Sequence, residues 1–146
     1  MAHVKNPFHI LSIEERIRIV SDVLHNALGC VDLHPEFCEL KWEELILEIG
    51  DLNWNVEEWK WDTVLFPDST RLTVHSAVCE NMQFLEKDFT WTVDTPQGIT
   101  LRQLTEGAFR MKGSEYNWWH DLFSKISCTS TVDNHLSIEA HFSHKS

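Results

Sequence analysis

The apolar residues of this chain repeat with two different periods, and that change of period limits the possible folds more than any other feature. Over residues 12–28, successive apolar side chains are four, three, four and four residues apart, which places them on one face of an α-helix: Ile13, Ile17, Val20, Leu24 and Leu28. Ser12 and Glu15 have the spacing of a capping box at the start of this helix. Gly29 follows the last apolar residue, so we expect it to end the helix in the left-handed conformation.

Four later segments alternate apolar and polar residues with a period of two, which is typical of half-buried β-strands. They are residues 59–66, 71–78, 88–93 and 135–142. In the last segment, the alternation directs an apolar set toward the core: Leu136, Ile138, Ala140 and Phe142. The outward set includes His135, Glu139 and His141. Imidazoles beside a carboxylate have the chemistry to bind a metal ion or to titrate near neutral pH, although such a face is more often only solvated.

Two helices are predicted between the third and the fourth of these strands. Thr100 and Gln103 have capping-box spacing, and the apolar side chains of residues 100–112 lie on one helical face. Residues 115–126, "EYNWWHDLFSKI", form a second amphipathic pattern with Trp119, Leu122, Phe123 and Ile126. Residues 40–49, "LKWEELILEI", fit a helix and a strand, so both remain open.

The order of these elements predicts a single α+β domain over residues 1–146. Strands grouped along the chain, with helices at either end, favour a mostly antiparallel sheet with the N-terminal helix and the two-helix segment packed on one face. The chain has the length of one ordinary domain, and 42% of its 146 residues are apolar. A domain of this size buries a core without needing disulfides or a metal ion.

The net charge restricts the possible partners. The chain carries 23 acidic and 12 basic residues, a formal net charge of −11. This charge repels nucleic acid and anionic membrane surfaces, so neither is an expected partner. The sequence shows no export signal and no apolar run long enough to span a bilayer. We therefore expect an intracellular protein, cytoplasmic or nuclear, with its four cysteines reduced.

A cluster of histidines and cysteines lies within "HNALGCVDLHPEFC", residues 25–38. Two histidines and two cysteines are a common ligand set for tetrahedral zinc: His25, Cys30, His34 and Cys38. The spacing lacks the Cys-x2-Cys knuckle of most structural zinc sites, so the ordinary interpretation is a helix flank, two small buried thiols and a surface loop. A small zinc-binding protein is therefore the alternative function, and no cofactor is expected otherwise.

No motif for catalysis is present. The sequence contains no nucleophile elbow, P-loop, dinucleotide fingerprint or His-Glu-x-x-His metal motif. An enzymatic activity is therefore not expected, although the sequence does not decide the question.

The seven tryptophans favour a function in binding. Exposed tryptophan is a typical anchor of protein interfaces, and carboxylates beside it suit a partner with a basic surface. The predicted anchors are Trp54, Trp59, Trp118 and Trp119, with Glu57 and Glu58 as rim charges. The sequence thus predicts a non-enzymatic interaction or assembly module that binds another protein or itself. A third function, an acidic mimic of nucleic acid, requires rows of carboxylates, whereas the sequence spreads them over the whole chain.

Overall fold

The computed structural model describes residues 11–29, 33–52, 60–76, 90–113 and 122–143. The helices are α1 (Ile13–Leu28), α2 (Trp42–Leu52) and α3 (Leu101–Arg110), with short 3₁₀ helices η2 (Pro35–Glu39) and η4 (Met111–Gly113). The strands are β1 (Val64–Phe66), β2 (Arg71–Ser76), β3 (Thr90–Asp94), β4 (Ile99–Thr100), β5 (Leu122–Val132) and β6 (His135–Ser143). The α+β class predicted from the sequence is confirmed.

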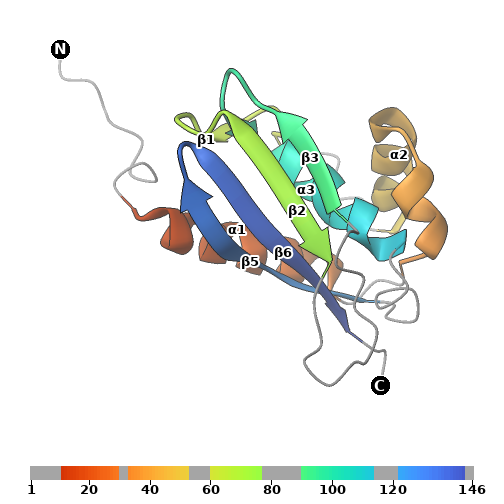
Figure 1. Ribbon diagram of the computed structural model, residues 1–146. Coiled ribbons are helices and arrows are strands. Elements are labelled where there is room, and N and C mark those ends of the chain that lie inside the picture. Colours follow the sequence, from red (N-terminus) through yellow and green to blue (C-terminus); the bar gives the residue numbers. More distant parts are fainter. Residues whose placement is uncertain (1–10, 30–32, 53–59, 77–89, 114–121, 144–146) are drawn as a thin grey trace, which may run out of the picture.

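The main sheet has four strands in the order β3-β2-β6-β5. The β2–β3 and β5–β6 pairs are antiparallel, whereas β2 and β6 run parallel. Strands β1 and β4 form a separate antiparallel pair. Helices α1 and α3 lie behind the main sheet in Figure 1, while α2 lies to one side, near β3 and α3. Among the described residues, no helix covers the opposite face of the sheet (Figure 1).

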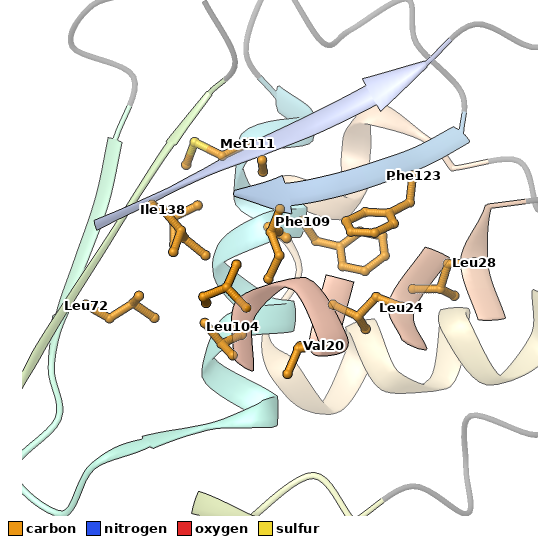
Figure 2. Packing of buried hydrophobic residues seen from close by; sticks show 14 of the residues in the cluster. Val20, Leu24, Leu28, Leu72, Leu104, Phe109, Met111, Phe123 and Ile138 are labelled. Carbon is orange, nitrogen blue, oxygen red and sulfur yellow. The ribbon is translucent and has the colours of Figure 1, made fainter. Parts of the chain in front are cut away.

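The core lies between the main sheet and the two helices behind it. Figure 2 shows apolar side chains from α1, α3 and η4 meeting those of the strands, and those labelled are Val20, Leu24, Leu28, Leu72, Leu104, Phe109, Met111, Phe123 and Ile138. The predicted inward set of β6 is buried throughout, because its side chains alternate along a regular strand. Burial of this contiguous apolar surface is the dominant favourable contribution to folding.

The start of α3 matches its sequence prediction in detail. The Thr100 hydroxyl accepts a hydrogen bond from the Gln103 backbone N–H, and the Gln103 side chain accepts one from the Thr100 backbone N–H. At the start of α1, the Ser12 hydroxyl accepts a hydrogen bond from the Glu15 N–H and donates one to the Glu15 carboxylate. Both helices therefore begin at the predicted caps.

The predicted left-handed end of α1 is wrong. Gly29 has φ −69° and ψ −13°, which is a right-handed helical conformation. Its N–H still donates to the His25 carbonyl, so the last turn of the helix closes without a reversal of the backbone.

The predicted second helix of the two-helix segment is wrong for residues 122–126, which begin strand β5. Phe123 and Ile126 are both buried, although residues three apart face opposite sides of a regular strand. A shift of register between Phe123 and Lys125 inserts the extra residue that returns Ile126 to the inner face. A β-bulge therefore imitates the spacing of a helix. Residues 114–121 of the predicted helix lie outside the described residues.

The structure decides one prediction that the sequence left open and corrects another. The open segment 40–49 is helical, because it forms most of α2. In the predicted strand 59–66, of which residues 60–66 are described, the described part that pairs as a strand is Val64–Phe66, and the Thr63 N–H closes a turn by donating to the Lys60 carbonyl. Asp133 and Asn134 join β5 to β6 with φ of 54° and 63°, the left-handed pair typical of a tight hairpin turn.

Candidate binding groove

An apolar groove runs between α1, the β1 strand and the start of α3. Its volume is about 340 Å³, at the lower end of the range of ligand sites. The described residues that line it are Ile19, Val20, Val23, Lys60, Thr63, Leu65 and Leu101. Five of these seven side chains are aliphatic, so the groove presents a surface that water solvates poorly.

The backbone fixes the wall of the groove opposite α1. The Leu101 N–H donates to the Thr63 carbonyl over 3.1 Å, and the Arg102 N–H donates to the Trp61 carbonyl over 2.8 Å. The first N–H groups of a helix have no acceptor within the helix, and here two of them in α3 donate to carbonyls of the loop before β1. The wall is therefore held by hydrogen bonds that do not depend on any side chain in the groove.

The α1 wall is open to solvent. Ile19 is 37% exposed and Val23 is 44% exposed, whereas their neighbour Val20 is 5% exposed and belongs to the core. Ile19 and Val23 are four residues apart, so their side chains lie one above the other on the helix surface. Single exposed apolar residues are common on proteins, but a contiguous apolar patch marks a binding surface.

Lys60 is the only ionisable side chain among the described residues that line the groove. It is exposed, and its ammonium group has three hydrogen-bond donors. Lys60 is therefore the one charge that the described lining contributes, in a chain whose net charge is −11.

The open face of the main sheet carries a polar network. The Thr73 hydroxyl lies 2.9 Å from the Thr92 hydroxyl and 2.7 Å from His135 Nε2. At the end of these strands, Arg71 Nε donates to Asp94 over 3.0 Å, beside a shallow hollow of about 450 Å³. Each of these polar groups already has a protein partner, so the network stabilises the pairing of β2, β3 and β6.

Three residues on β5 and β6 resemble a catalytic triad in composition but not in geometry. Ser127 Oγ lies 3.3 Å from His141 Nε2, and Glu139 Oε1 lies 3.5 Å from the same nitrogen. In a Ser–His–acid triad the carboxylate binds the other ring nitrogen, leaving Nε2 to accept the serine proton. Burial lowers the pKa of His141, and Glu139 opposes this effect while Lys125 adds to it. The arrangement does not activate Ser127.

A polar hollow lies on the other side of α1, between that helix and β5. It has a volume of about 340 Å³ and carries both signs of charge, from Glu14, Arg18, Asp22 and Lys125. Cys128 also lines it, and burial is the main cause that raises the pKa of this thiol. A thiol with a raised pKa is a poor nucleophile at neutral pH.

The predicted partner-binding residues all lie outside the described part of the chain: Trp54, Trp59, Trp118, Trp119, Glu57 and Glu58. The three described tryptophans are partly buried. Trp42 and Trp61 pack edge to face with ring centroids 5.1 Å apart, and the Arg102 guanidinium lies over the Trp42 ring. These contacts attach α2 to the start of α3, beside the groove.

The predicted zinc ligands are described in part. His25 is exposed on α1, His34 is exposed at the start of η2, and Cys30 lies outside the described residues. Cys38 is half-buried on η2, and burial is the main cause that raises the pKa of its thiol. Across the described ranges, no three histidine, cysteine or acidic side chains gather closely enough to hold a metal ion.

The α1 groove was not predicted from the sequence, although its signal is present there. Ile19 and Val23 interrupt the polar side of α1 at a spacing of four, beside the predicted core stripe.

Among the described helices, none is long and apolar enough to cross a membrane. Comparison of the chain with protein-family models, with curated proteins and with solved structures finds no match.

Proposed function

We propose that this protein is a non-enzymatic interaction module whose α1 groove binds an apolar segment of a partner protein. The observation that carries the proposal is the exposure of Ile19 and Val23 beside the aliphatic groove. Covering apolar side chains of this kind releases their hydration water, which is the main driving force of protein association.

The open form of the groove favours a protein segment over a small molecule. A small-molecule site buries on the order of 70–90% of its ligand's surface. Here the α1 wall is itself more than one-third exposed at both Ile19 and Val23, so a small ligand stays open to water on one side. A helix laid along the groove contacts both walls and brings its own backbone hydrogen bonds, as helix-in-groove partners do.

The charge favours a different protein over a second copy of this chain. Docking of one groove onto another brings the two Lys60 side chains toward the same apolar centre, because a two-fold interface is self-complementary. A heterologous partner avoids this cost.

No contact among the described residues favours the other two functions predicted from the sequence. Two described carboxylates pair with arginines, Asp94 with Arg71 and Glu106 with Arg110. For zinc, three of the four predicted ligands are described, and they form no metal-binding cluster. The groove therefore supports the binding function best.

Comparative capture from cell extract tests this function. Wild-type protein and two variants serve as baits: Val23→Asp places a charge on the groove wall, and Val132→Asp places the same charge on another exposed valine at the end of β5. We expect a partner that binds the wild type and Val132→Asp but not Val23→Asp. Identical capture by all three baits contradicts the proposal. Sedimentation velocity tests the other possible occupant, which is a second copy of this chain. A wild-type dimer that Val23→Asp dissociates assigns the groove to self-association instead.

A further inference from the structure

The groove has a second property that narrows the chemistry of its occupant. Its described lining contains one ammonium group, from Lys60, one hydroxyl, from Thr63, and no carboxylate. We infer that the bound segment carries a carboxylate beside its apolar side chains and that Lys60 binds this carboxylate. The inference rests on the proposed function, because it names the chemistry of the partner at the same groove.

Three described arginines have partners within the protein, whereas Lys60 lines the groove. Arg71 pairs with Asp94, and Arg110 donates to the Cys38 carbonyl and pairs with Glu106. Arg102 lies over the Trp42 ring and within 3.9 Å of Glu106. For Lys60, no carboxylate of the described residues shares the groove lining. Its ammonium group therefore offers donors to whatever fills the groove.

The local charge, rather than the net charge, decides what binds at physiological salt. The Debye length is about 8 Å at an ionic strength of 0.15 M, so most of the charge of −11 is screened at the distance of the groove. A direct contact between Lys60 and a bound carboxylate is much less screened than the distant charges, because the two groups lie well within the Debye length. The groove consequently selects an acidic amphipathic segment, even though the whole protein is acidic.

A double-mutant cycle tests the pairing. Two helical peptides share one leucine stripe, with leucines at positions i, i+3, i+4 and i+7, and differ only in glutamate or glutamine beside the stripe. Fluorescence anisotropy measures the binding of both peptides to wild-type protein and to Lys60→Gln at physiological salt. Lys41→Gln is the matched control, because Lys41 is exposed just before α2, outside the groove lining, and its loss changes the net charge equally.

We expect the glutamate peptide to bind the wild type about five-fold more tightly than the glutamine peptide, as one partly desolvated ion pair produces. Lys60→Gln is expected to remove this preference, and Lys41→Gln is expected to keep it. Equal binding of the two peptides to the wild type, with both lost in Val23→Asp, overturns the inference and leaves the proposed function standing. Binding of neither peptide overturns the inference, and capture that is also insensitive to Val23→Asp then overturns the proposed function.

Discussion

Helices α1 and α3 cover the same face of the sheet, yet they differ in what they present to solvent. The inner side of α3 is sealed, with Leu104, Ala108 and Phe109 each at most 1% exposed. Its outer side carries a row of charges in which Glu106 lies between Arg102 and Arg110, each four residues away. Such a row stabilises a helix surface and keeps it solvated. Apart from Leu101 at its start, which lines the groove, the residues of α3 are thus accounted for by folding.

The inner side of α1 is equally well packed, with Leu24 and Leu28 at most 1% exposed. Its outer side differs, because Ile19 and Val23 stand among charged residues without burial to explain them. Both α1 and α3 therefore cover the sheet, but α1 also exposes apolar side chains that do not pack in the core. That difference is the reason to assign binding to α1 and scaffolding to α3.

The largest expected contrast is between Leu104→Ala on α3 and Val23→Ala on α1. Leu104 is fully buried, so its truncation leaves a cavity and is expected to lower the free energy of unfolding by about 2–5 kcal/mol. Val23 is 44% exposed, so its truncation is expected to change that free energy by no more than about 0.5 kcal/mol. Urea denaturation of both variants measures the difference. If Val23→Ala lowers the free energy of unfolding nearly as much as Leu104→Ala, Val23 belongs to the core and α1 has no spare apolar surface at that position.

Gly107 tests how tightly α3 packs against the sheet. A Cβ atom at this position lies 2.5 Å from Val74 Cγ2 and 2.9 Å from Trp91 Cε3, closer than atoms pack. Gly107→Ala gains about 1 kcal/mol of helix propensity, but the overpacking against a stiff valine and a large ring costs about 1–3 kcal/mol. We expect a net loss of about 0–2 kcal/mol in the free energy of unfolding, measured by chemical denaturation. An increase in stability instead means that α3 moves off the sheet without penalty.

The elements predicted best from the sequence are those whose residues agree at every level. Residues 100–112 combine a capping box with an apolar stripe, and both signals lead to the same helix, α3. Residues 122–126 carry a stripe alone, and there a β-bulge reproduces the helical spacing within β5. Tertiary pairing with β6 decided that segment, and no local pattern contains that pairing.

The candidate site was less predictable than the fold, for a different reason. The groove depends on β1 and the start of α3 coming beside α1, which involves residues far apart in sequence. The sequence positions of Ile19 and Val23 indicate the α1 wall, because both fall on the polar side of the helix. Leu65 and Leu101 have no sequence feature that distinguishes them from core residues. The tryptophans that the sequence favoured as anchors, such as Trp54 and Trp118, lie outside the described residues, so that prediction still stands as one.

The smallest expected effect concerns the outer side of α3, and it tests whether that side acts only in stability. Glu106→Gln removes the carboxylate between two arginines, 3.4 Å from Arg110 and 3.9 Å from Arg102. We expect a loss of about 0.3–1 kcal/mol in the free energy of unfolding, because ion pairs between helix residues four apart contribute little. The loss should shrink at high salt, where these charges are screened, whereas loss of partner capture by Val23→Asp should persist there because apolar contacts are not screened. If Glu106→Gln also abolished capture, the binding surface would extend along α3 beyond Leu101, and the two helices would share the binding function.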